Sequence, residues 1–262
     1  MPFFTGLLAV IKKIASSSAT TSRAVILTQA LLGLFALIYF ISTEQYRFIG
    51  FSIVGMFVLE HVGHNVGLHR YFTHNAFKTS RFWHIFLCFF SCLVCSGSPF
   101  SYTVAHRAHH LYTDTDKDPH HAGIGFFRVM LYQWDLKHIP IHATKGLSER
   151  WIQAAHQNYV FIVLGFFAFL VAIDYRYALA YSLSVMAVMF GEAWVNFLNH
   201  TNSNPFAYRN FDTPDKSSND LIAGYFFGEW HNNHHKYPSR YNEQVRWWEV
   251  DIPAIFIKAI KK

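Results

Sequence analysis

The stretch HRAHH at residues 106–110 decides the fold, because it sets three histidines at positions i, i+3 and i+4. Residues three and four apart share one face of a helix, so the three imidazoles aim at one place. The same spacing returns about 120 residues later in HNNHH at residues 231–235. A solvated polar helix would explain one such cluster, but two copies of an identical spacing indicate metal ligands. The fold must therefore bring these two segments together.

Two more segments add histidines. In HRYFTH at residues 69–74, His69 and His74 are five positions apart. Their side chains would diverge by about 140° on a regular helix, so we expect them to face two neighbouring metals. His200 ends an apolar stretch, and Asn196, one turn earlier on the same face, could reach a metal through water.

The histidines outnumber the ligands that one metal holds, so the sequence predicts a dinuclear metal site. The predicted ligands are His69, His74, His106, His109, His110, His200, His231, His234 and His235. Structural zinc would favour four ligands in a closed tetrahedron, often with Cys, whereas imidazole also suits iron and copper. The residues alone leave the identity of the metal open.

The composition predicts a surface that faces lipid, because charged residues make up only 15% of the chain, against about 25% in soluble domains. A helix needs about 20 apolar residues to cross a bilayer. Four stretches approach this length, at residues 24–42, 48–68, 159–173 and 177–198, and short links join them into two hairpins. Of the 22 Lys and Arg, only Arg47 and Arg176 lie in these links. The positive-inside rule then places the termini and the histidine clusters in the cytoplasm.

A fifth apolar stretch, residues 82–94, would separate the first two histidine clusters if it crossed the membrane. We therefore expect it to be buried or to lie in the membrane plane, and residues 3–15 to form an interfacial helix. The predicted fold class is an all-α integral membrane protein with a single domain, residues 1–262. Four transmembrane helices carry a helical cytosolic cap, residues 69–158 and 199–262, which holds the dinuclear metal site.

Acidic residues near the clusters are expected to orient the ligands, since a metal-bound imidazole usually donates its other N–H to an acceptor. The candidates are Asp114, Asp116, Asp118, Glu192 and Glu229. Glu60 and His64 lie one turn apart, and we expect them to hydrogen-bond to each other rather than to bind metal. His120 and His121 are expected to act, at most, through other ligands.

The clusters HRYFTH, HRAHH and HNNHH resemble the three histidine boxes of the membrane fatty acid desaturases, in order and in separation. The resemblance is closest to the delta-9 acyl-CoA or acyl-lipid branch, whose first box reads HRxxxH and whose third reads HNxHH. It covers nearly everything after residue 50 and extends through GSP (97–99), DTDKDPH (114–120), NFLNH (196–200), YRNFDTPDKSSND (208–220), GEWHNNHHKYP (228–238) and RWWEVD (246–251).

This resemblance implies two iron ions held by the nine histidines, with Asn196 bound through water. It implies that reduced di-iron activates O2 and that a cis double bond, at the delta-9 position, is placed in a saturated fatty acyl chain within an apolar tunnel. The chain shows no HPGG haem motif and no four-Cys site. Electrons are therefore expected from a separate protein of the ferredoxin, rubredoxin or cytochrome b5 type. A bacterial inner membrane is favoured over the endoplasmic reticulum.

Several alternatives stay open. Val104 and Ala105 stand where acyl-CoA members carry an Arg-Asp pair, so acyl-CoA, an acyl-lipid and an acyl-carrier thioester all remain as carriers. A di-iron hydroxylase of an alkane, sterol or other lipid would share the first C–H abstraction. A membrane metal-binding or transport protein is the alternative of another class, but transport sites lie near the midplane and these clusters lie outside the spans. Scattered basic residues argue against a nucleic-acid partner.

Overall fold

The computed structural model describes residues 18–262, and in this part of the chain all regular structure is helical apart from two isolated β-bridges. The helix expected at residues 3–15 lies outside the described residues. The long helices are α2 (Ser18–Ser42), α3 (Tyr46–Val58) with its π-helical continuation η1 (Leu59–Thr73), α8 (Tyr159–Ile173), and α9 (Tyr175–Ala193) with its π-helical continuation η5 (Trp194–Leu198). The shorter helices are α4 (Arg81–Phe90), η2 (Ser91–Val94), α5 (Pro99–Tyr112), η3 (Ala122–Ile124), α6 (Phe126–Met130), η4 (Ile141–Thr144), α7 (Arg150–Gln157), α10 (Leu221–Phe226), α11 (His231–Lys236) and α12 (Ile252–Ile260).

Within residues 18–262, three helical stretches are long and apolar enough to cross a membrane, namely Arg23–Ser42, Tyr46–Thr73 and Tyr175–Leu198. They cover the first, second and fourth of the predicted spans. The third predicted span is α8, which has 15 residues and qualifies only when it is counted with α7 across a 65° bend. With the second bent pair, formed around α4 and α5, the structure holds three to five candidate spans.

The stretch at residues 82–94 does not continue into α5 as a straight helix. The chain leaves η2 through Cys95 and Gly97, whose φ angles of 65° and 103° are left-handed. Ser98 then caps α5 in a capping box, with Pro99 in the first turn, a start signal that fits a new helix. The two helical parts meet at 77°, the geometry of a broken span or a re-entrant loop. Either geometry is compatible with this bend, so the expectation that the stretch is buried or lies in the membrane plane stays a prediction.

The long helices pack through small residues, as membrane helices commonly do. α9 lies against both α2 and α3. A Cβ atom added at Gly33 or at Gly55 would come closer than 3.0 Å to Ser182 or Ser184 of α9. The Ser184 hydroxyl also donates to the carbonyl of Ser52 at 2.9 Å. Close backbone approach and buried hydroxyl bonds therefore hold this bundle together.

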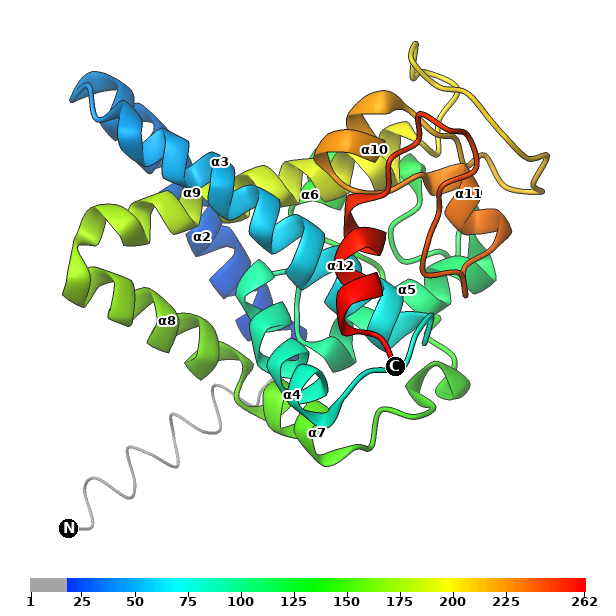
Figure 1. Ribbon diagram of the computed structural model, residues 1–262, viewed down its shortest axis with the longest axis horizontal. Coiled ribbons are helices and arrows are strands. Elements are labelled where there is room, and N and C mark those ends of the chain that lie inside the picture. The colour runs from blue at the N-terminus through cyan, green and yellow to red at the C-terminus, as the bar shows by residue number, and fades with distance from the viewer. Residues whose placement is uncertain (1–17) are drawn as a thin grey trace.

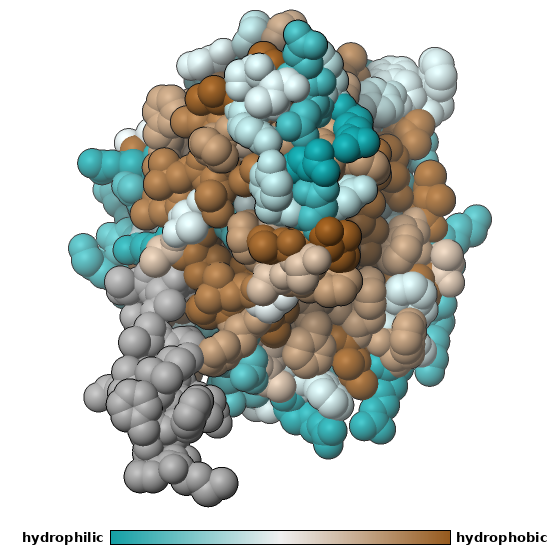
Figure 2. All heavy atoms as spheres, turned by 90° about the vertical axis from the view of Figure 1, so that its left-hand side faces the viewer, coloured by the Kyte–Doolittle hydropathy of each residue, from teal (hydrophilic) through white to brown (hydrophobic). Residues whose placement is uncertain are grey.

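Figure 1 shows that the hairpins α2–α3 and α8–α9 project to one side, whereas α5, α10, α11 and α12 gather on the other. Seen from the hairpin side, the surface in Figure 2 is mostly hydrophobic. Large apolar side chains contribute to this exposure, among them Leu31, Ile38 and Phe169. A surface of this kind is expected of helices that face lipid.

Gly224 in α10 provides a test of the packing in the cap. A Cβ atom at this position would come closer than 3.0 Å to the ring of the fully buried Trp230. We expect Gly224→Ala to lower the free energy of unfolding by about 1–3 kcal/mol, as overpacking does. Thermal unfolding in detergent measures this. Gly165→Ala in α8 is the control, since no atom lies within 4 Å of an added Cβ there, and an equal loss in both variants would contradict the prediction.

Candidate metal centre

The structure brings all nine predicted histidines into two adjoining groups. Each histidine contributes one ring nitrogen, and within each group these nitrogens all lie within 4.8 Å of one another. The expectation that the three imidazoles of each HxxHH cluster aim at one place was wrong, because each cluster divides between the two groups. The rings of His110 and His235 stand 4.7 Å apart across the boundary. The first group is His69, His74, His106, His110 and His234, and the second is His109, His200, His231 and His235.

His69 and His74 belong to the same group, which contradicts the expectation that they face two metals. The reason is the π-helical winding of η1. In this helix the backbone bonds run from residue i+5 to residue i, and the amide of His74 donates to the carbonyl of His69 at 3.2 Å. Residues five apart therefore lie one turn apart on one face. The estimate of about 140° holds only for a regular α-helix.

Each histidine of the second group is held by a carboxylate through Nδ1. The Nδ1–H of His109 donates to Asp118 at 2.9 Å, and that of His200 donates to Asp114 at 3.1 Å. His231 pairs with Glu229 and His235 with Asp215 in the same way. These bonds assign the proton to Nδ1, so the Nε2 lone pairs of all four rings are left for the centre of the group.

In the first group several Nε2 atoms converge on one another. His234 Nε2 lies 3.0 Å from that of His69 and 2.9 Å from that of His110. His110 Nε2 is in turn 3.1 Å from that of His106. Two facing nitrogens cannot both carry a hydrogen at this separation, so lone pairs accumulate here. A shared cation is the partner that satisfies them together.

Burial keeps the imidazoles of His74, His234 and His235 neutral. Loss of hydration lowers the pKa of His74 and of His235 to about 3, and that of His234 well below its usual 6.5. Within residues 18–262, the Nε2 atoms of His74, His109 and His235 have no hydrogen-bond partner. Unprotonated, buried and convergent nitrogens are the donor set that a transition metal requires. The residues present therefore fit a metal.

Asn196 lies in η5, one turn before His200, as expected. It is buried, and its amide donates to the carbonyl of Glu192 at 2.8 Å, which leaves its Oδ1 for another partner. The recorded contacts of Asn196 do not include a histidine of either group, so its role through water stays a prediction.

Of the predicted orienting acids, Asp114, Asp118 and Glu229 contact the histidines, whereas Asp116 is exposed. Glu192 binds the hydroxyl of Ser96 instead. Two further orienting acids were missed, and both come from segments without regular spacing. They are Asp215, bonded to His235 at 3.1 Å, and Glu243, which lies 3.4 Å from His234 Nδ1. Asp215 stands in the quoted stretch 208–220, but no local pattern distinguishes it from its neighbours.

His64 forms the predicted hydrogen bond, with Nδ1 2.9 Å from Glu60. Its Nε2 lies 2.8 Å from the hydroxyl of Tyr102, whose ring stacks on His106 at 5.4 Å. Glu60, His64 and Glu192 thus form a polar cluster next to the first group rather than part of it. His120 is buried and stacks on His109 at 4.2 Å, which places it behind a predicted ligand, as expected.

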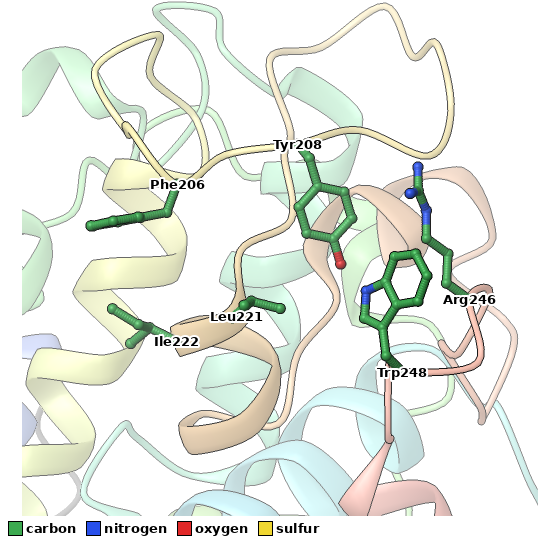
Figure 3. Close-up of a pocket in the computed structure, with 6 residues that line it drawn as sticks. All are labelled: Phe206, Tyr208, Leu221, Ile222, Arg246 and Trp248. Atoms are coloured by element: carbon green, nitrogen blue, oxygen red, sulfur yellow. The ribbon is translucent and has the colours of Figure 1, made fainter.

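A cavity of about 350 Å³ lies beside α5, and no predicted metal ligand is among the described residues that line it. Its wall includes Leu136, Ile139 and Gln157, as well as Tyr102 and Ala105. Because Tyr102 stacks on His106, this part of the wall lies against a predicted ligand. A second hollow, of about 470 Å³ and lined by Phe206, Tyr208, Leu221, Ile222, Arg246 and Trp248, lies in the surface, and no histidine lines it (Figure 3).

The arginine of each of the first two boxes ties the site to other segments. Arg107 donates to the carbonyls of Phe72 and Thr73, and so joins the second box to the first. Arg70 is completely buried and pairs with Asp251 at 2.8 Å and with Glu243 at 3.1 Å. The end of the chain is thereby fixed to the first box.

The fold and the histidine groups define a helical membrane protein with a buried centre suited to metal. The sequence model of the family described as fatty acid desaturase matches residues 45–252. The chain is 32% identical over 231 residues to the sn-1 stearoyl-lipid 9-desaturase of Anabaena variabilis, an alignment that covers 84% of this chain and 83% of the relative. The chain therefore belongs to the fatty acid desaturase family and is an oxidoreductase that desaturates fatty acyl chains.

Two other relatives show how the family varies. The hex-5-enoyl-[acyl-carrier protein] acetylenase of Moorena producens is 29% identical over 239 residues, which cover 80% of this chain and 73% of the relative. The Delta-9 acyl-lipid desaturase 2 of Arabidopsis thaliana is 29% identical over 237 residues, which cover 87% and 75%. Membership in this family implies use of a metal, in agreement with the two histidine groups.

Replacing Arg70 tests the buried ion pairs. Arg70→Met would leave Asp251 and Glu243 as two uncompensated buried carboxylates. Removing one partner of a buried pair costs about 3–5 kcal/mol, so we expect a large fall in the thermal midpoint in detergent. Arg81→Met, at an exposed position, serves as the control. A midpoint for Arg70→Met equal to that of the control would show that the pairs do not stabilise the fold.

Proposed function

We propose that this protein is an O2-dependent di-iron desaturase that introduces a cis double bond, at the delta-9 position, into a saturated fatty acyl chain. The observation that carries the proposal is the pair of adjoining histidine groups, with five and four members, beside a cavity whose wall includes Tyr102, the residue that stacks on His106. Two bound irons would activate O2 for the removal of two hydrogens from an unactivated chain.

The two groups would each hold one iron, with His69, His74, His106, His110 and His234 on one and His109, His200, His231 and His235 on the other. Asn196 would contribute through water. Imidazole nitrogens suit iron, and the carboxylates on Nδ1 fix the tautomer and the ring orientation. The second group has four such carboxylates, so its rings are held more firmly than those of the first group.

The cavity beside α5 would hold the acyl chain. Its walls are mainly apolar, with Ile26, Val104 and Ile139 among them, and this suits a hydrocarbon. Neighbouring methylenes are electronically alike, so only fixed geometry can select one pair. Tyr102 and Ala105 in these walls would position the reacting carbons, because Tyr102 stacks on His106 and Ala105 precedes it.

The carrier of the acyl chain would be a lipid, a carrier protein or CoA. Named relatives act on lipid-bound and carrier-bound chains. Val104 and Ala105, which replace a charged pair in acyl-CoA members, both line the cavity. The part of the wall that these two residues form would therefore present no charge to an acyl chain, and the charged residue in the lining is Arg23.

We further propose four transmembrane helices, with α8 as the third, in a single domain over residues 1–262. The termini and the histidine groups would be cytoplasmic, in a bacterial inner membrane. Arg47 and Arg176 at the hairpin links, against 22 Lys and Arg in the chain, support this orientation. A separate ferredoxin, rubredoxin or cytochrome b5 type of protein would supply the electrons.

Expression in cells with analysis of their fatty acids tests the function. Gas chromatography–mass spectrometry should show a new monounsaturated acid with the wild type and none with His109→Ala or His234→Ala. Those variants should also lose bound iron while still inserting into the membrane, because a ligand is missing. A hydroxylated product would instead establish a hydroxylase.

His64→Ala is the matched control, since His64 is a buried histidine outside both groups. It should keep its iron. Loss of half the iron in this variant, or full activity in His109→Ala, would overturn the ligand assignment.

Asp215 and Glu243, the two acids that the sequence did not predict, give an independent test of the metal ligands in the two groups. Asp215→Asn and Glu243→Gln should lower metal affinity about 10–100-fold, as the loss of a partner behind a ligand does. Iron retained during dialysis against a graded chelator measures the effect. Asp212→Asn, at an exposed position close to Asp215 in sequence, should behave like the wild type. Equal iron retention in all three variants would contradict the proposed role of these acids.

A further inference from the structure

In the C-terminal part of the cap, most acidic side chains are buried, whereas the basic side chains are exposed. Residues 199–262 contain seven Asp and Glu, of which five are buried and a sixth, Asp215, is bonded to His235. Only Asp212 remains as an exposed acid. All eight cations of the segment are exposed, and they are Arg209, Lys216, Lys236, Arg240, Arg246, Lys258, Lys261 and Lys262. The acids that orient the centre thus leave a cationic surface outside it.

Two of these lysines stand directly next to the second histidine group. Lys236 follows His235 in α11. Lys216 follows Asp215, the partner of His235, and its backbone N–H donates to Asp114, the partner of His200. The surface that carries these lysines is therefore separated from the centre by a single layer of side chains.

Aromatic rings lie among the cations. Arg240 sits over the ring of Tyr237 at 5.4 Å, and Tyr237 packs edge-on against Phe211 at 5.3 Å. Tyr237 is 40% exposed. Cations supported by exposed aromatic rings are common at sites of protein recognition.

Arg246 extends the same surface. Its guanidinium lies over Tyr208 at 5.3 Å and over Trp248 at 5.2 Å, and Figure 3 shows the three side chains at one end of the hollow. Tyr208 donates to Glu249 at 2.8 Å, and Glu249 accepts from Asn233 at 3.0 Å. Asn233 precedes His234, so a short chain of hydrogen bonds leads from this part of the surface to the first group.

The location of this surface favours a soluble partner. In Figure 1, α11 and the loop that precedes α10 lie at the end of the molecule opposite the α2–α3 and α8–α9 hairpin turns. The mostly hydrophobic surface in Figure 2 is on the hairpin side. A bilayer that receives the hairpins therefore has this end of the cap pointing away from it.

We propose that the cationic face formed by Arg209, Lys216, Lys236, Arg240 and Arg246 docks a soluble, acidic, one-electron carrier protein. The proposal rests on the proposed function, because desaturation needs electrons from outside. A saturated chain, O2, two electrons and two protons become an unsaturated chain and two waters. Two carrier molecules would each be oxidised by one electron, and opposite charge would steer both encounters.

Binding of an acidic [2Fe–2S] ferredoxin to the full-length, iron-loaded protein in detergent tests the proposal. Microscale thermophoresis should show that Lys216→Glu combined with Lys236→Glu weakens binding about tenfold or more, since charge reversal at a steering surface acts on association. Wild-type binding should also weaken as salt rises, because exposed charges are screened. Lys258→Glu, an exposed lysine of α12 outside the face, is the control and should bind as the wild type does.

Iron content is measured for each variant, so damage to the centre is detected separately from loss of docking. Unchanged ferredoxin binding in the double variant, or equal weakening in Lys258→Glu, would overturn the proposal. So would loss of binding to phosphatidylglycerol vesicles in the double variant with ferredoxin binding intact, which would make the face a membrane contact. Failure of the proposed function is distinguishable, because it would appear as absence of a desaturated product from the wild type with any reductant.

Discussion

The structure depends on holding many imidazoles neutral, buried and pointed inward. A buried polar group is unfavourable unless it is hydrogen-bonded, and here the Nδ1–H groups of the second histidine group are satisfied by carboxylates. Two of these acids, Asp114 and Asp215, come from other segments, so their bonds also join parts of the chain. Asp114, which follows α5, holds His200 at the end of η5 and accepts from the backbone of Lys216. The same interactions that orient the rings therefore assemble the cap.

The cavity and the histidine groups share side chains as well. Tyr102 has three contacts at once: its ring stacks on His106, its hydroxyl meets His64, and its side chain lines the cavity. Glu60 fixes His64 from the other side at 2.9 Å. A change in the polar cluster behind the cavity would thus affect both the wall of the cavity and a ring of the first group. One packed unit sets the shape of that wall and the position of the ring.

Much of this arrangement follows from sequence, but for different reasons in different places. The HxxHH clusters could be predicted to turn toward one region because residues three and four apart on a helix face the same way, but the division of their rings, with His106 and His110 in one group and His109 in the other, could not. The grouping of His69 with His74 could not be predicted either, since η1 is π-helical and the estimate of the angle between them assumed a regular α-helix. Asp215 and Glu243 lie in irregular segments, where no period relates a side chain to a distant partner. For α8, length alone does not decide between a crossing and one arm of a bent pair.

The pairing of Arg70 with Asp251 and of His69 with His234 has a consequence for how the protein is made. The partners in these two contacts are 181 and 165 residues apart. A ribosome that builds the chain from its N-terminus delivers the first box long before either partner exists. Until the last quarter of the chain has been translated, the Arg70 guanidinium and the His69 imidazole lack these partners. During that time they are hydrated or bound to other polar groups. The contacts of the first box with His234 and Asp251 can therefore form only after these residues have been synthesised.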